Sequence, residues 1–164
     1  MSRYCVVVAE GSRARFFTLE QAELPELESG PNLVEKRTMV NPEHQAHADV
    51  LWTDRMGRNR SPNGQSHRYD DHRSQRTEEM ERRFARDIAR ELDSMTRANG
   101  TRRVVLCAEK RMLGFLRRTI QGNMPSDVDL QEIAKDLAKL TPHQLHERLA
   151  REGRIPRRTG RKGH

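Results

Sequence analysis

The stretch from Gly57 to Arg76 carries the residue types best suited to chemistry, and it contains almost no apolar side chains. At its centre, Pro62-Asn63-Gly64-Gln65 combines turn-favouring residues, a conformationally permissive glycine and a primary amide. The arginines that flank this tip are Arg55, Arg58, Arg60, Arg68, Arg73 and Arg76. Because such a segment cannot bury itself, we expect an exposed loop that probes a polar partner rather than a linker.

Four histidines and four aspartates also lie in or near this loop. The histidines are His44, His47, His67 and His72, and the aspartates are Asp49, Asp54, Asp70 and Asp71. Their types suit a metal site, but no predicted strand or helix fixes their geometry. We therefore expect no metal there and interpret the region as a solvated loop whose acids balance its arginines.

Two basic pairs lie on predicted secondary structure. Lys110 and Arg111 begin a predicted helix, where cations oppose the helix dipole, so they are candidates for a phosphate contact. Arg13 and Arg15 lie in the first predicted hairpin and are candidates for the same role. The alternative for both pairs is an ordinary solvated surface.

Most of the net positive charge lies at the C-terminus. The 164-residue chain has a net charge of +7, and residues 151–164 carry +5 of it, because six basic residues face only Glu152. The first 150 residues carry +2, which excludes a uniformly basic nucleic-acid binder. We expect one domain over residues 1–150 and a disordered basic tail over 151–164, which either contacts polyanions or only improves solubility.

Composition limits the class of protein further. Hydrophobic residues make up 34% of the chain, which predicts a small core. No apolar run reaches the roughly 18 residues of a membrane helix, and the N-terminus lacks a signal-peptide pattern, so we expect a cytoplasmic protein without a membrane span. Cys5 and Cys107 lie in apolar runs and are predicted to be buried thiols.

Apolar patterns predict the elements that hold the loop. Strands are expected at Tyr4 to Ala9, Ala14 to Leu19, Leu33 to Val40, Arg103 to Ala108 and Val128 to Ile133. A long helix is expected from Ser74 or Thr77 to Asn99-Gly100, with Met80, Phe84, Ile88 and Leu92 on one face and acids near its start. Further helices are expected at Lys110 to Gln121 and from Thr141-Pro142 to about Glu152.

The order of these elements predicts the fold class. We expect a single α/β domain whose mixed sheet has N-terminal antiparallel strands followed by β-α-β units, with helices packed on it. We expect residues 41 to about 74 to form the exposed loop of this domain.

With these pieces in order, the chain resembles the middle domain of archaeal and eukaryotic class I peptide-chain release factors. The resemblance rests on VVVAEGSRARFFTL (residues 6–19), the basic loop GRNRSPNGQS and the long helix QRTEEMERRFARDIAREL. The chain is still more similar to small bacterial host-attachment proteins, through SRARFF, MLGFLRR and AKDLAKLTPHQLHERL. Together the two resemblances cover roughly residues 3–150 and imply a release-factor-like fold.

The release-factor resemblance implies a release or rescue factor that acts on the ribosome. The loop would enter the site of peptidyl-tRNA, where the backbone N–H of Gly64 would face the developing oxyanion and Gln65 would position a water. The flanking arginines, with Lys110 and Arg111, would bind RNA phosphates. The implied partners are ribosomal RNA and peptidyl-tRNA, and no metal or other cofactor is implied.

Two departures from the release-factor pattern leave hydrolysis open. Asn63 stands in place of the first glycine of Gly-Gly-Gln and adds a side chain beside the oxyanion position. We also find no codon-reading domain in these 164 residues, so we do not expect a stop-codon-specific terminator. The host-attachment resemblance implies the alternative, a non-enzymatic interaction protein involved in attachment to host cells or surfaces.

Overall fold

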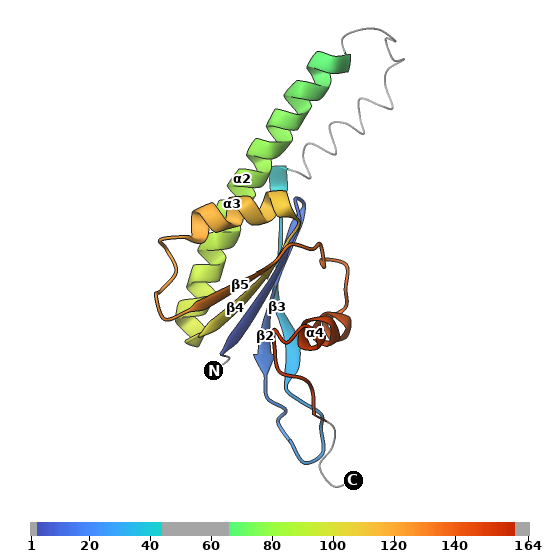
Figure 1. Ribbon diagram of the computed structural model, residues 1–164, viewed down its shortest axis with the longest axis vertical. Helices are drawn as coiled ribbons and strands as arrows, with labels where there is room; N and C mark the ends of the chain where they lie inside the picture. Colours follow the sequence, from blue (N-terminus) through green and yellow to red (C-terminus); the bar gives the residue numbers. More distant parts are fainter. Residues whose placement is uncertain (1–2, 44–65, 160–164) are drawn as a thin grey trace.

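A five-stranded sheet lies at the centre of the part of the chain that the computed structural model describes, residues 3–43 and 66–159. The strands are β1 (Tyr4–Ala9), β2 (Arg13–Glu20), β3 (Asn32–Val40), β4 (Arg103–Cys107) and β5 (Asp129–Ile133), in the spatial order β3-β2-β1-β4-β5. The β1–β2 and β2–β3 pairs are antiparallel, whereas β1–β4 and β4–β5 are parallel. The predicted single α/β domain with a mixed sheet is therefore confirmed (Figure 1).

Helices cover both faces of the sheet (Figure 1). Helices α2 (Ser66–Asn99) and α3 (Lys110–Ile120) pack on one face, and α4 (Pro142–Arg151) packs on the other. This arrangement explains why β1 reads as a continuous apolar run. Cys5 and Val7 join the cluster under α2 and α3, whereas Val6 and Val8 join the cluster under α4.

The predicted burial of the two cysteines is confirmed. The side chains of Cys5 and Cys107 are fully buried, and both are free thiols. Burial raises the pKa of each thiol to about 12, because the charged thiolate would lose its hydration. Both residues are therefore packing residues of the sheet rather than reactive groups.

Helix α2 begins at Ser66, so the prediction that it begins at Ser74 or Thr77 is wrong. Its buried residues fall between Met80 and Thr96, and the N-terminal part extends beyond the sheet (Figure 1). Residues 66–74 show no apolar periodicity, so the sequence pattern could not reveal this part of the helix. Once the packed part has formed, each added residue gains a hydrogen bond without a new nucleation cost. The predicted loop of residues 41–74 therefore does not include residues 66–74, which belong to α2.

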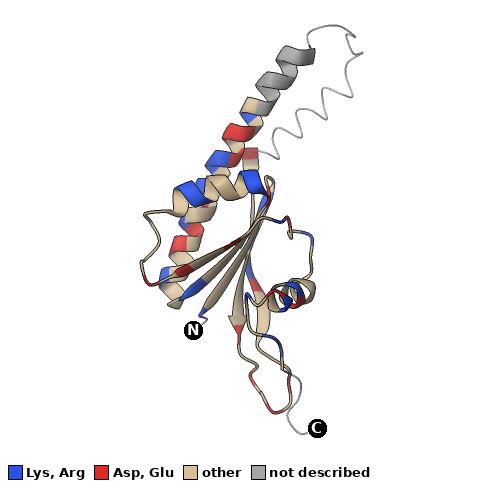
Figure 2. Ribbon diagram, in the orientation of Figure 1, with Lys and Arg blue, Asp and Glu red and all other residues tan. Residues whose placement is uncertain are grey.

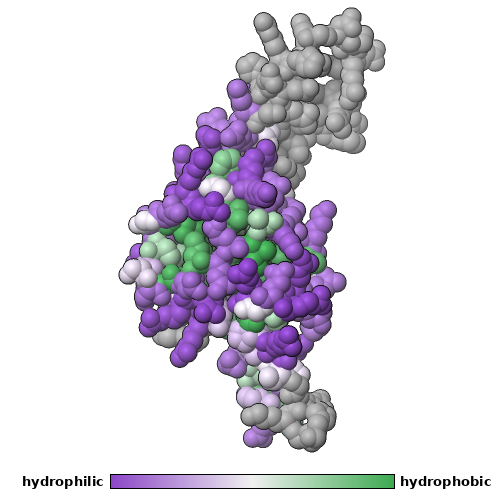
Figure 3. Space-filling view, viewed as in Figure 1, coloured by the Kyte–Doolittle hydropathy of each residue, from purple (hydrophilic) through white to green (hydrophobic). Residues whose placement is uncertain are grey.

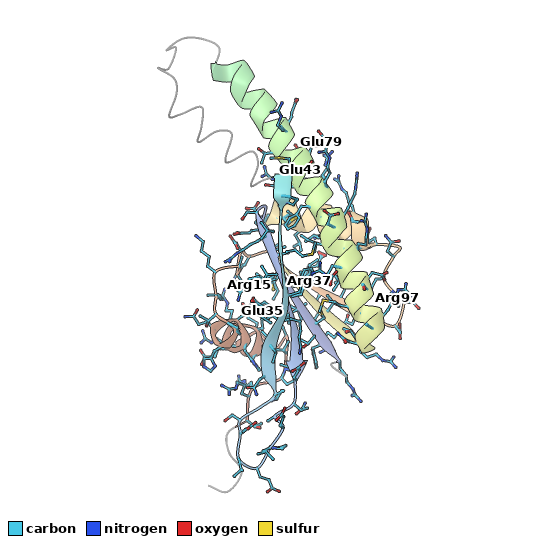
Figure 4. All side chains as sticks on the ribbon, turned by 180° about the vertical axis from the view of Figure 1, so that it is seen from behind. Arg15, Glu35, Arg37, Glu43, Glu79 and Arg97 are labelled. Atoms are coloured by element: carbon cyan, nitrogen blue, oxygen red, sulfur yellow. The ribbon has the colours of Figure 1, made fainter. Side chains whose placement is uncertain are left out.

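The acids predicted to lie near the start of α2 lie instead in its interior, where they form ion pairs. Glu79 accepts a hydrogen bond from Arg83, 2.9 Å away, and Arg83 also donates to Glu43, just beyond β3. Figure 4 shows Glu43 and Glu79 beside each other. Hydrogen bonds from Arg83 to these two carboxylates raise its pKa above its usual value.

Residues 154–159 pack against the domain, although they belong to the tail that composition predicts to be disordered. Ile155 is only 4% exposed and belongs to the core cluster under α4. The backbone N–H of Thr159 donates to the carbonyl of Gly30 at 2.8 Å. The burial of Ile155 and this backbone pairing both help to hold a segment whose composition is otherwise polar.

The predicted start of α4 is confirmed. The hydroxyl of Thr141 accepts the backbone N–H of Gln144 at 3.2 Å, and the side chain of Gln144 accepts the N–H of Thr141 at 3.0 Å. Pro142 occupies the first turn, where no backbone donor is needed. The predicted end of α2 at Asn99-Gly100 is also confirmed. Gly100 directly follows the last residue of α2 and has a φ of 61°, a backbone conformation that commonly ends helices and favours glycine.

Candidate functional site

The tip of the predicted loop lies outside the described residues. The predicted catalytic residues Asn63, Gly64 and Gln65 are therefore not among the residues that the structure describes. The same holds for three of the predicted RNA-binding arginines, Arg55, Arg58 and Arg60. Arg68 and Arg73 fall within α2, and Arg76 is exposed on that helix. The roles assigned to all of these residues remain predictions.

Lys110 and Arg111 begin α3 as predicted, and both are exposed. Arg111 donates to both carboxylate oxygens of Glu81 on α2, from Nε at 3.0 Å and from Nη2 at 2.8 Å. Glu81 is 5% exposed, and a Cβ atom on Gly11 would lie 2.7 Å from its Oε1. The hydrogen bonds with Glu81 raise the pKa of Arg111 above its usual value. Arg111 thus joins α3 to α2 beside the β1–β2 turn.

Arg15 also has an internal role. It is buried, and it donates to Glu35 and to the carbonyl oxygens of Ala138 and Leu140 at 2.9 and 2.6 Å. Its guanidinium lies over the ring of Phe17, 4.9 Å from the ring centroid. Figure 4 shows Arg15 and Glu35 together on the sheet. The solvated surface that the sequence left open for Arg15 is therefore not observed.

A groove lined by arginines lies between α2 and α3, and we call it the basic groove. Its first hollow, of about 230 Å³, is lined by Arg82, Arg86, Phe115, Arg118 and Thr119. Its second hollow, of about 330 Å³, is lined by Arg86, Ala89, Arg90, Asp93, Arg97, Thr119 and Asn123. The two hollows share Arg86 and Thr119, so they form one continuous feature along α2.

Two periodicities of α2 create the basic groove. Phe84, Ile88 and Leu92 recur every fourth residue and are buried on the sheet. Arg82, Arg86 and Arg90 recur with the same spacing on an exposed part of the helix surface. Figure 2 shows basic residues along α2 and at both ends of α3, and Figure 3 shows mostly hydrophilic residues where α2 rises above α3.

Helix α3 supplies the opposite wall of the basic groove. Its residues Met112, Leu113 and Leu116 are buried against the sheet, which fixes the direction in which the rest of the helix points. Phe115 is 9% exposed, and the guanidinium of Arg82 lies 5.3 Å from the centroid of its ring. Arg118 follows Phe115 by almost one turn and is exposed.

The positive charge of the basic groove is only partly neutralised. Ion pairs join Arg82 to Glu78 and Arg97 to Asp93, each at 2.9 Å. Among residues 3–43 and 75–159, whose side chains the structure describes, neither Arg86 nor Arg118 has a carboxylate within ion-pair distance. Within that part of the chain, these two guanidinium groups, one from each wall, have no counter-charge.

The chemistry of the basic groove is that of binding. Guanidinium groups stay protonated and donate hydrogen bonds, so they bind sulfate, carboxylate or phosphate groups but do not abstract protons. The hydroxyl of Thr119 already donates to the carbonyl of Phe115 at 3.0 Å. The carboxylate of Asp93 accepts from Arg97. Its described lining residues therefore include no free nucleophile with an adjacent base.

Sequence reasoning missed the basic groove. The four-residue spacing of Arg82, Arg86 and Arg90 was a signal, but it also fits an ordinary solvated helix face. Arg118 and Phe115 join these arginines only because α3 packs beside α2. That juxtaposition depends on the β4-α3-β5 crossover and has no local pattern in the sequence.

A model of the protein family described as "Protein required for attachment to host cells" matches residues 5–149. No curated protein sequence matches the chain. In the described part of the structure, no helix is both long enough and apolar enough to span a membrane.

The family match corrects the expectation of a role in translation. It supports the host-attachment resemblance, whereas the relationship to release factors is not shown. A ribosomal release or rescue function with peptidyl-tRNA hydrolysis conflicts with this family. The Asn63-Gly64-Gln65 pattern alone is weak support for a role in translation, because asparagine and glycine are common in polar loops of many functions.

Proposed function

This chain belongs to the family of proteins required for attachment to host cells. We propose that it is an interaction protein whose basic groove binds an acidic partner during attachment. The observation that carries the proposal is the pair Arg86 and Arg118, which face one hollow without carboxylate partners in the described structure. Charged donors of this kind form short, strong hydrogen bonds with sulfate and carboxylate groups.

The length of the basic groove favours an extended partner over a single small anion. Arg82 and Arg97 are fifteen residues apart on α2, and a rise of 1.5 Å per residue separates them by about 22 Å. An acidic polymer lying along the helix can meet several guanidinium groups at once. Each contact adds to the total affinity without requiring a deep pocket.

The aromatic content of the basic groove indicates which acidic polymer fits. Phe115 is the only aromatic residue in its described lining, and it is 9% exposed beneath Arg82. Single-stranded nucleic acids are usually held by aromatic side chains on which successive bases stack. Since the basic groove has charge without such a platform, an acidic polysaccharide is the partner we propose.

The walls of the basic groove are fixed before any partner binds. Phe84, Ile88 and Leu92 hold α2 on the sheet, and Met112 and Leu116 hold α3. The bidentate contact between Arg111 and Glu81 joins the two helices directly. A preformed groove loses less conformational entropy on binding than a flexible segment would.

Attachment of cells to cultured host cells tests this proposal. Cells would carry the wild-type chain, the Arg86→Ala/Arg118→Ala variant, or the charge-matched control Lys110→Ala/Lys139→Ala. Both control lysines are exposed, lie outside the basic groove and lack an ion-pair partner among the described residues. We expect attachment to fall with the arginine variant and to stay at the wild-type level with the control. Equal attachment by all three would contradict the proposal.

A further inference from the structure

A basic cavity that is separate from the basic groove lies on the opposite face of the sheet, between α4 and the C-terminal segment of residues 154–159. Its volume is about 420 Å³, and we call it the α4 cavity. The residues that line it are His143, His146, Glu147, Ala150, Arg151, Arg157 and Arg158. Those from α4 have the spacings of one helix face, and the two from the C-terminal segment close the opposite side.

The C-terminal segment is held on both sides of its two arginines. Before them, Ile155 is buried, and the carbonyl of Pro156 accepts a hydrogen bond from Nε2 of His146 at 2.8 Å. After them, the N–H and the hydroxyl of Thr159 both donate to the carbonyl of Gly30, at 2.8 and 3.1 Å. Arg157 and Arg158 are therefore positioned by the fold rather than carried on a free tail.

The positive charge of the α4 cavity exceeds its negative charge. Its one carboxylate, on Glu147, lies 3.2 Å from Nε2 of His143, and Nδ1 of His143 lies 3.1 Å from Nη1 of Arg158. Arg151 and Arg157 have no carboxylate within ion-pair distance in the described part of the chain. Like charges gathered at one hollow without counter-charges are typical of an anion site.

His146 provides a second, independent observation. It is 2% exposed, forms part of the wall, and its Nδ1 is buried without a hydrogen-bond partner in the described structure. Because Nε2 faces a carbonyl, it carries the proton of the neutral ring, and Nδ1 is the atom that takes up a second proton. Burial lowers the pKa of His146. An anion in the cavity would favour the protonated ring.

We infer that the α4 cavity binds a tetrahedral oxyanion, the phosphate or sulfate group of a small ester. Arg151 and Arg157 supply uncompensated guanidinium groups from two directions, a geometry that suits an anion with several oxygen atoms. Because protonation of His146 adds positive charge beside the anion, binding is coupled to proton uptake. The α4 cavity is separate from the basic groove, and this inference does not depend on the proposed function.

Titration of the full chain with inorganic phosphate and with inorganic sulfate tests the inference, with sodium acetate as the monoanionic control. Backbone amide shifts in NMR spectra report which residues respond. We expect saturable changes in α4 and residues 154–159 with phosphate or sulfate, and at least tenfold weaker binding by Arg151→Ala/Arg157→Ala. The ligand that binds more tightly identifies the ester class. The inference would be overturned if acetate bound as tightly as phosphate and sulfate do, or if the amide shifts changed only in other parts of the chain.

A matched variant controls for the loss of two charges near α4. Lys135 and Arg148 both pair with Glu152, at 3.8 and 3.2 Å, and neither lines the α4 cavity. The Lys135→Ala/Arg148→Ala variant should bind phosphate within twofold of the wild type. A loss as large as that of Arg151→Ala/Arg157→Ala would mean that only overall charge matters and would overturn the inference.

The imidazole resonances of His146 give a separate readout. In the wild type, we expect the midpoint of the His146 pH titration to be higher in saturating phosphate than in sodium chloride of the same ionic strength. The Arg151→Ala/Arg157→Ala variant should show no such rise. An unchanged midpoint in the wild type would refute the coupling between anion and proton binding.

Discussion

Replacing Arg15 with methionine should destabilise the fold far more than the same change at Arg13. Both side chains leave β2 and donate to the carbonyl of Ala138, Arg13 at 2.8 Å and Arg15 at 2.9 Å. They differ in burial, because the side chain of Arg13 is 40% exposed and that of Arg15 is 11% exposed. Only Arg15 also reaches the carbonyl of Leu140, at 2.6 Å, just before α4.

The magnitude follows from the groups that Arg15→Met leaves behind. The part-buried carbonyl of Leu140 loses its charged donor, and the cost of about 1–3 kcal/mol for a fully buried unpaired group is the upper range for this loss. The carbonyl of Ala138 keeps Arg13, and Glu35 is 32% exposed and reaches water, so these two add less. Methionine retains part of the apolar contact with Phe17. We expect a loss of about 2–3 kcal/mol for Arg15→Met and below about 1 kcal/mol for Arg13→Met.

Urea unfolding followed by far-UV circular dichroism measures both losses. The free energies of unfolding should differ by about 2 kcal/mol between the variants, with similar m-values. Free energies that agree within about 0.5 kcal/mol would refute the reasoning, because the internal hydrogen bonds of Arg15 would then contribute little. If the two free energies agreed in this way, the segment leading into α4 would be held by its apolar residues alone.

Three further predictions concern packing, pH and thiol reactivity. Gly11→Ala should lower the free energy of unfolding by about 1–3 kcal/mol, because the new Cβ would meet Oε1 of Glu81 at 2.7 Å. A urea titration measures this loss, and an unchanged free energy would show that Glu81 moves away freely. Burial lowers the pKa of His146 in the folded state, so the unfolded state binds the proton first, and stability should fall as the pH drops below about 6.5. His146→Gln should reduce this dependence in the same titration repeated at several pH values, and an identical pH profile would contradict the assignment. Since the pKa of both Cys5 and Cys107 is raised to about 12, a thiol reagent at pH 8 should modify them only after unfolding, and rapid labelling of the native protein would contradict their burial.

Local sequence patterns were sufficient to predict the sheet and most element boundaries. Continuous apolar runs such as Tyr4–Ala9 indicated strands buried on both faces, and β1 has these bounds. Thr141-Pro142 predicted the start of α4, because a side-chain cap and a proline both act within one helical turn. These signals depend on neighbouring residues only, so they survive without knowledge of the tertiary structure.

Features without an apolar pattern were missed or misassigned. The first turns of α2 extend beyond the sheet and therefore show no amphipathic period. Ile155 fixes a polar segment with one buried side chain, which composition alone could not reveal. The basic groove depends on Arg86 and Arg118 meeting across two helices that are separated by β4. Its parts were visible in the sequence, but their proximity was not.

The affinity of the purified protein for heparin, measured over a range of salt concentrations, tests the proposed role of the basic groove most directly. Heparin serves as a linear sulfated probe, and its binding should weaken as salt screens the guanidinium groups. We predict that Arg86→Ala/Arg118→Ala binds at least tenfold more weakly at low salt and depends less steeply on salt than the wild type. The Lys110→Ala/Lys139→Ala variant should remain close to the wild type. Equal affinity and salt dependence for the wild type and the arginine variant would contradict the account.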